Sequence, residues 1–119
     1  MYLSVIIPAY NEEKHIRTTI ESIYRYLSNK NMEHEIMVVT DGSTDTTDDI
    51  VRSMFPATPT IQLLNYKPNK GKGYAVCQGM LKAKGQYRLF TDADNATSID
   101  HIEKMMPYFK DGYDVVIAS

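Results

Sequence analysis

The chain has 119 residues, 43% of them hydrophobic, which is enough to bury one moderate core and predicts a single domain over residues 1–119. Thirteen Lys and Arg against fifteen Asp and Glu leave a net charge of −2, which argues against nucleic-acid binding through a broad positive surface. A single cysteine, Cys77, excludes an internal disulfide, and no long apolar run or signal-peptide pattern is present, so we expect a cytoplasmic protein.

Strand and helix patterns alternate from the first residues onward. Leu3 to Ile7 is a short apolar run typical of a buried strand, and we expect Pro8 to end it. Aliphatic residues then recur at steps of four, three and four, which predicts an amphipathic helix from Glu12 to about Asn29 with Asn11 as its N-cap. The chain therefore opens with a strand, a polar loop and a helix.

The same unit repeats through the middle of the chain. Residues 36–39 predict a second buried strand, and the polar turn "TDGSTD" leads into a helix capped by Asp45 or a neighbouring hydroxyl. The apolar face of that helix includes Phe55, and prolines follow it. Residues 61–64 predict a third strand, followed by the basic loop "NYKPNKGKG".

A third helix and two more strands complete the pattern. The helix is expected from about Tyr74 to Ala83, with Cys77 as a small core residue and Gly85 just past its end. Residues 87–91 predict the fourth strand, residues 92–97 its exit loop, residues 102–109 the apolar face of a helix, and residues 114–119 a fifth strand.

This order of elements predicts an α/β fold with a mostly parallel sheet and helices on both faces. Ligands of such sheets bind outside the carboxyl ends of the strands. Three polar segments, "AYNEE", "TDGSTD" and "TDADNAT", each follow a predicted strand, so we expect them to meet at one edge of the sheet.

Asp92 and Asp94 stand one residue apart directly after the fourth strand. Two carboxylates this close can share a divalent cation, and hard oxygen ligands favour Mg²⁺ or Mn²⁺, with substrate phosphates completing the metal's shell. The alternative is structural, because aspartate after a strand is also an ordinary turn or cap residue.

Four motifs in order carry a resemblance to a known family: "SVIIPAYNEE", "VVTDGSTDTT", "NKGKGYAVCQGMLKAKGQY" and "LFTDADNAT". Together they resemble the N-terminal half of an inverting family 2 glycosyltransferase of the GT-A fold, closest to the dolichyl-phosphate glucosyltransferase type. The resemblance covers essentially the whole chain. It implies a Rossmann-like, nucleotide-sugar-binding domain that assists transfer of a sugar, with glucose favoured.

The resemblance also implies site residues. The nucleotide-binding loop would comprise Pro8, Ala9, Tyr10, Asn11 and Glu12, with Asp41 accepting a hydrogen bond from the base and with Gly71 and Lys72 near the nucleotide. Asp92, Ala93 and Asp94 match the D-x-D signature, which gives Asp92 and Asp94 catalytic and metal-binding roles and places Asp92 and Ala93 against the substrate.

The donor and acceptor follow from the same resemblance. Ala96 stands where mannosyl-type relatives tend to carry a metal-binding glutamine, and the pair Ala96-Thr97 resembles the glucosyl type, so UDP-glucose is the favoured donor and GDP-mannose the alternative. The acceptor would be a sugar or a lipid phosphate such as dolichyl phosphate. A lipid phosphate is already largely ionised and needs little help from a protein base.

The chain ends inside its predicted fifth strand. We therefore expect it to be the donor-binding half of a longer enzyme, truncated at its C-terminus. We expect the parent enzyme to act at the cytoplasmic face of a membrane. Apolar surface left uncovered would favour self-association. One alternative is a non-catalytic nucleotide-sugar and metal-binding module. A receiver domain would need an acidic pair after the first strand, and a D-x-D-x-T phosphatase would need threonine at position 96.

Overall fold

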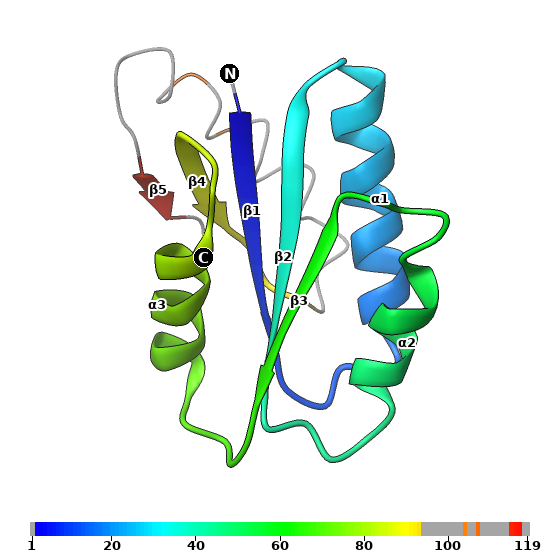
Figure 1. Ribbon diagram of the computed structural model, residues 1–119, viewed down its shortest axis with the longest axis vertical. Helices are drawn as coiled ribbons and strands as arrows, with labels where there is room; N and C mark the ends of the chain where they lie inside the picture. The colour runs from blue at the N-terminus through cyan, green and yellow to red at the C-terminus, as the bar shows by residue number, and fades with distance from the viewer. Residues whose placement is uncertain (1, 94–103, 105–106, 108–114, 118–119) are drawn as a thin grey trace.

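Residues 2–93, 104, 107 and 115–117 are described by the computed structural model of the chain. Their strands form one parallel sheet in the order β3-β2-β1-β4-β5 (Figure 1). The strands are β1 (Tyr2–Ala9), β2 (Glu33–Asp41), β3 (Ile61–Tyr66), β4 (Tyr87–Phe90) and β5 (Val115–Ile117). The predicted parallel α/β fold is thereby confirmed.

Helices cover both faces of the sheet, as the sequence predicts. Figure 1 shows α1 (Ile16–Asn29) and α2 (Thr47–Met54) on one side of the strands and α3 (Lys72–Lys82) on the other. In the part of the chain that the structure describes, no helix has the length and apolarity needed to cross a membrane. Except for Lys104 and Pro107, the helix expected around residues 102–109 lies outside the described residues.

Side chains of β1 alternate between two hydrophobic clusters. Leu3, Val5 and Ile7 pack in the cluster that contains α1 and α2, whereas Ile6 packs in the cluster that contains α3. Successive side chains of a strand point to opposite faces, so a strand covered on both sides reads as a continuous apolar run. That is why the run in β1 predicts a central strand.

The predicted stripe of α1 is confirmed, because Ile16, Ile20, Ile23 and Leu27 are all fully buried. Burying each of these side chains contributes about 1.5–3 kcal/mol. The predicted start was wrong: the helix begins at Ile16 rather than Glu12, and its N-cap position is His15, which makes no side-chain capping bond. The side chain of Asn11 binds another loop instead.

Pro8 lies inside β1 and does not end it, which corrects the sequence expectation. The Ile6 carbonyl accepts a hydrogen bond from the Thr91 amide, so the backbone of alternate residues, including Pro8, faces β4. Pairing with β4 ends at Ile6, whereas pairing with β2 continues to Ala9. Because no β4 residue pairs opposite Pro8, the missing N–H of proline breaks no ladder bond.

Small residues bring α3 close to the sheet. Ala75, Gly79 and Ala83 recur at steps of four and are buried, and a Cβ built on Gly79 would lie 2.6 Å from the Ile6 Cγ2 atom. Cys77 lies on the opposite side of the helix and is exposed, so its expected core role was wrong. Spacing alone does not tell which face of α3 is buried when the contacting residues are this small.

Gly85 allows its backbone to approach a neighbouring strand closely and does not form a left-handed helix cap. A Cβ on Gly85 would lie 2.4 Å from the Ser4 Oγ atom, and the Gly85 amide donates to that oxygen at 2.8 Å. Ser4 in turn donates to the buried Glu35 carboxylate, which also accepts from the Lys84 amide at 2.6 Å. This buried polar cluster ties the segment after α3 to β1 and β2.

The end of α2 also differs from expectation. The helix stops at Met54, and Phe55, expected on its apolar face, is 53% exposed. The Thr58 amide and hydroxyl both bind the Met54 carbonyl, so the chain turns away before Phe55 can reach the core.

Replacement of Gly79 by alanine is expected to lower the free energy of unfolding by about 1–3 kcal/mol, because the new methyl group overlaps Ile6 and Val39. Gly73→Ala in the same helix is the matched control, since a Cβ there meets nothing within 4 Å, and it is expected to stabilise by about 0.5–1 kcal/mol. Denaturant titration of both variants measures the difference. Equal midpoints would contradict the close packing of α3.

Candidate functional site

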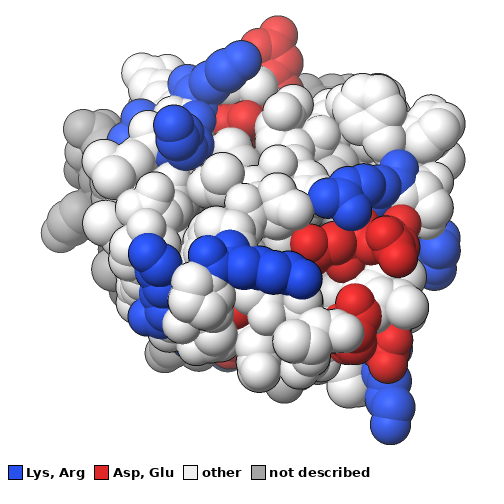
Figure 2. Space-filling model, turned by 60° about the horizontal axis from the view of Figure 1, so that its bottom comes forward, with Lys and Arg blue, Asp and Glu red and all other residues white. Residues whose placement is uncertain are grey.

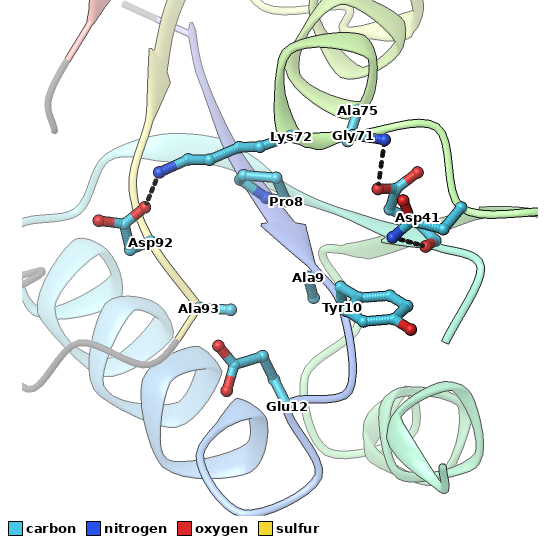
Figure 3. A pocket seen from close by; sticks show the side chains of 11 residues that line it. Pro8, Ala9, Tyr10, Glu12, Asp41, Gly71, Lys72, Ala75, Asp92 and Ala93 are labelled. Atoms are coloured by element: carbon cyan, nitrogen blue, oxygen red, sulfur yellow. Dashed lines mark hydrogen bonds and ion pairs between the residues drawn. The ribbon is translucent and has the colours of Figure 1, made fainter. Parts of the chain in front are cut away.

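A cavity of about 440 Å³ opens where β1, β2 and β4 end (Figure 3). It lies beside β1, where the strand order reverses: β2 and β3 lie on one side of β1, and the chain then crosses from β3 to β4 on the other side, which is the usual ligand position in open parallel sheets. The cavity is lined by Pro8, Ala9, Tyr10, Glu12, Asp41, Asn69, Gly71, Lys72, Ala75, Asp92 and Ala93.

The end of β1 supplies one side of the cavity. Tyr10 is 48% exposed, so its ring offers an open aromatic face. The Glu12 carboxylate points toward Ala93 (Figure 3) and lies 3.3 Å from the His15 ring. Two side chains of one short loop thus reach the cavity, one aromatic and one acidic.

Asp41 ends β2 and holds the loop that precedes α3. Its buried carboxylate accepts hydrogen bonds from the Lys70 amide at 2.8 Å and the Gly71 amide at 2.9 Å. Asn69 donates to the Asp41 carbonyl at 3.1 Å, and Gly42 has a positive φ of 71° and lies against the Asn69 backbone. These contacts fix the basic loop over the end of β2.

Tyr66, the last residue of β3, is paired in register with Asp41. Burial raises the pKa of the Tyr66 phenol, and the Asp41 carboxylate raises it further. Tyr66 therefore stays a neutral phenol beside a carboxylate over the physiological pH range.

An ion pair crosses the cavity from α3 to the end of β4. The Lys72 Nζ atom lies 2.5 Å from the Asp92 carboxylate and 5.6 Å from the centre of the Phe90 ring (Figure 3). The neighbouring Ala93 carbonyl accepts a buried hydrogen bond from the Thr19 hydroxyl of α1 at 2.7 Å. The backbone that carries Asp92 is thus anchored, whereas the half-exposed Lys72 side chain can move.

Charge is unevenly distributed around the site. Residues 50–91, which include the basic loop and α3, contain no Asp or Glu. On the face shown in Figure 2, acidic side chains gather toward the side of α1 and α2, and basic ones dominate the side of α3. The α3 side of the cavity therefore suits an anionic ligand.

Asp45 in the β2–α2 loop binds the first residue of α2, although the N-cap position is Thr46, which makes no side-chain capping bond. One carboxylate oxygen accepts from the Thr47 amide at 2.9 Å and from its hydroxyl, and the other accepts from the Glu13 amide at 3.2 Å. Burial alone would raise the pKa of the Asp45 carboxyl, but the bonds from Thr47 and Glu13 together hold that pKa below its usual value.

The structure brings together nine of the ten predicted substrate-binding residues around the cavity. Asn11 is the exception, since its side chain binds the β2–α2 loop. Asp94, predicted to be catalytic and to bind metal, lies outside the described residues. Asn69 and Ala75 were missed: Asn69 stands in the basic loop that pointed to the site, whereas no sequence signal marks Ala75.

The donor groups around the cavity are oxygens, which suit Mg²⁺ or Mn²⁺ better than zinc. Asp92 presents a partly exposed carboxylate to the cavity, while both oxygens of Asp41 already accept backbone amides. Within the described part of the chain, no group of three or more His, Cys, Asp and Glu residues is arranged so that it could hold a metal ion. Of the described carboxylates that line the cavity, Asp92 and Glu12 are thus the ones available to a metal.

Fold and cavity together define a parallel α/β ligand-binding domain with its site at the switch point of the sheet. The chain belongs to glycosyl transferase family 2, whose sequence profile matches residues 4–119. The family resemblance of the four motifs is confirmed.

The chain is similar to several dolichyl-phosphate beta-glucosyltransferases. It is 41% identical to one from Trichomonas vaginalis over 108 residues, which cover 87% of this chain and 33% of the relative. It is 38% identical to that of Dictyostelium discoideum over 112 residues, which cover 88% of this chain and 34% of the relative. The chain thus spans about a third of the length of these relatives.

Solved structures share the fold. S. aureus TarS 1–349 in complex with UDP-GlcNAc matches 91% of this chain and 32% of its own, with a TM-score of 0.72 and 29% identity. The mannosyltransferase PcManGT from Pyrobaculum calidifontis, in complex with GDP-Man and Mn²⁺, matches 87% of this chain and 32% of its own, with a TM-score of 0.71 and 27% identity. The expected GT-A type of fold is confirmed.

Stability is expected to depend on pH through Asp45. Because the folded-state pKa is lowered, the stabilisation is present above the unfolded pKa, near 3.8, and is lost as the pH falls through the folded value. Denaturant unfolding between pH 3 and 6 should show this loss, and Asp45→Asn should flatten the profile. A carboxyl titration of Asp45 with a midpoint at or above 3.8 would contradict it.

Proposed function

We propose that this chain binds a nucleotide-diphosphate sugar and forms the donor-binding part of a dolichyl-phosphate glucosyltransferase. The enzyme would transfer glucose from UDP-glucose to dolichyl phosphate with the help of Mg²⁺ or Mn²⁺. The observation that carries the proposal is the convergence of the loops after β1, β2 and β4 on one cavity. The names of the curated relatives support the choice of glucose and of the lipid acceptor.

The nucleoside would lie between Tyr10 and Asp41. The exposed Tyr10 ring can stack on the base. Such stacking does not depend on which base is bound, because every base has a flat aromatic face. Each Asp41 oxygen accepts one backbone amide and has a second lone pair, so the carboxylate can still accept from the imide N–H of uracil. Glu12, which shares the β1–α1 loop with Tyr10, would accept hydrogen bonds from the ribose hydroxyls.

The diphosphate would lie between Lys72 and Asp92. The Lys72 ammonium pairs with Asp92, and its partly exposed side chain lets it turn toward a phosphate oxygen. Asp92 would then hold the cation together with Asp94. A bound divalent cation supplies charge stabilisation to the departing diphosphate, and Lys72 adds a second positive charge on that side.

Attack by the acceptor requires little assistance from the described residues. A phosphomonoester with a second pKa near 6 is largely ionised at neutral pH, so its oxygen attacks the anomeric carbon without a protein base. The new C–O bond forms as the bond from that carbon to the nucleoside diphosphate breaks. Positioning and charge stabilisation of the donor are then the tasks of this cavity.

Calorimetric titration with UDP-glucose, GDP-mannose and UDP-GlcNAc in the presence of Mn²⁺ tests the donor proposal. UDP-glucose is expected to bind most tightly, and chelation of the metal should weaken its binding, because Asp92 and the diphosphate would share the cation. A transfer assay with radiolabelled UDP-glucose and dolichyl phosphate follows. Absence of binding by all three nucleotide sugars would reject the proposal.

Asp92→Asn is expected to reduce the Mn²⁺-dependent affinity for UDP-glucose roughly 10- to 100-fold, the scale of a lost bond to a charged group. The matched control is Asp49→Asn, which removes the same charge from an exposed carboxylate of α2 that pairs with Arg52. The control should bind like the parent chain. Equal affinities of the two variants would remove Asp92 from the donor site.

A further inference from the structure

Two loops beside the cavity are joined by hydrogen bonds in both directions. Three consecutive backbone amides of the β1–α1 loop donate to side chains of the β2–α2 loop and of Thr47, the first residue of α2. Asn11 donates to the Ser43 hydroxyl at 3.0 Å, Glu12 to the Thr47 hydroxyl at 2.9 Å and Glu13 to the Asp45 carboxylate at 3.2 Å. These three amides of the first loop are therefore satisfied by side chains of the second loop and of α2.

The reverse direction uses two side chains of the β1–α1 loop. The Asn11 Oδ1 atom accepts from the Thr44 amide at 2.7 Å and the Asp45 amide at 3.3 Å. The Glu13 carboxylate accepts from the Thr46 amide at 3.2 Å. Three consecutive amides of the β2–α2 loop are thus bound by side chains of the β1–α1 loop, whose own three amides are bound by the β2–α2 loop and by Thr47 of α2. We call this set of contacts the loop clasp.

Asn11 is the central residue of the loop clasp and has an unusual backbone. Its φ of 51° lies in the left-handed region, which asparagine tolerates better than most residues. Its neighbours Tyr10 and Glu12 line the cavity, whereas Asn11 itself does not. The left-handed turn separates the three side chains, so that two face the cavity and the middle one faces the β2–α2 loop.

The contacts bear directly on the geometry of the cavity. Asp41 is the last residue of β2, directly before the β2–α2 loop, and it also holds the Lys70 and Gly71 amides. Tyr10 and Glu12 reach the cavity from the other loop. Beyond the ends of the strands, the loop clasp therefore fixes the positions of Tyr10 and Glu12 relative to Asp41.

We propose that Asn11 is a positioning residue for nucleotide binding and makes no contact with the nucleotide. It holds the Tyr10 ring and the Glu12 carboxylate at a fixed place opposite Asp41. This inference rests on the proposed donor site and replaces the substrate-contacting role that the family resemblance implies for Asn11.

Asn11→Gly tests the proposal, because glycine keeps the left-handed backbone while the side chain that carries the acceptor oxygen is removed. We expect the affinity for UDP to fall about tenfold, the scale of one or two lost hydrogen bonds. Asn31→Gly is the matched control: Asn31 has nearly the same φ, 55°, but lies between α1 and β2 at the far end of the sheet. It should bind UDP like the parent chain, and an equal loss in both variants would overturn the proposal.

A double-mutant cycle separates positioning from direct contact. If Asn11 acts through its neighbours, Asn11→Gly should weaken UDP binding much less in a Tyr10→Ala background than in the parent chain. Full additivity of the two losses would overturn the positioning role. Asn11→Asp, which keeps the Oδ1 acceptor, should restore most of the affinity.

Amide hydrogen exchange tests the loop clasp without any ligand. In Asn11→Gly the Thr44 and Asp45 amides should exchange at least about tenfold faster, while the Gly71 amide, held by Asp41, should be unchanged. If the parent chain binds no UDP, the proposed function fails, and the exchange data still decide whether Asn11 joins the loops. Unchanged exchange of Thr44 and Asp45 would overturn the inference.

Discussion

The parallel direction of the strands is the constraint on which the site depends. Because β1, β2 and β4 run the same way, the loops that follow them all leave from one edge of the sheet. A parallel sheet needs helices on both faces, and the helices here are held by the two hydrophobic clusters on either side of β1. The cavity is therefore a consequence of strand direction, and its particular chemistry comes from the loops.

Three described carboxylates at this edge each have a hydrogen-bond or ion-pair donor. Asp41 accepts two backbone amides, Asp45 accepts the first amide of α2, and Asp92 pairs with the ammonium of Lys72. The partners differ in mobility, since backbone amides are fixed whereas a lysine side chain can turn away. This difference separates acids that shape the cavity from an acid that can accept a cation.

Close backbone approaches shape the rest of the molecule around this edge. Gly79 lets α3 lie against β1 and β2, and Gly42 lets the basic loop fold over the end of β2. Both contacts bring Lys72 and Gly71 to the cavity, although the two residues belong to a different face of the sheet from α1. Packing at some distance from the cavity thus determines which side chains surround it.

The sequence by itself determined the order of the elements, the parallel sheet and most of the site. Apolar runs and the stripe of α1 report burial along one element, and polar segments after strands indicate the edge where ligands bind. The family motifs then point to Tyr10, Asp41, Lys72 and Asp92. These signals are local in the chain, which is why a single sequence contains them.

Only the tertiary structure decided the roles that depend on a partner far along the chain. Pro8 stays within β1 because β4 no longer pairs there, and Gly85 is needed because Ser4 lies against it. Asn11 has the pattern of a helix cap, yet its partners are amides more than thirty residues away. Periodicity and composition describe one element at a time, whereas such contacts exist only once two elements are packed together.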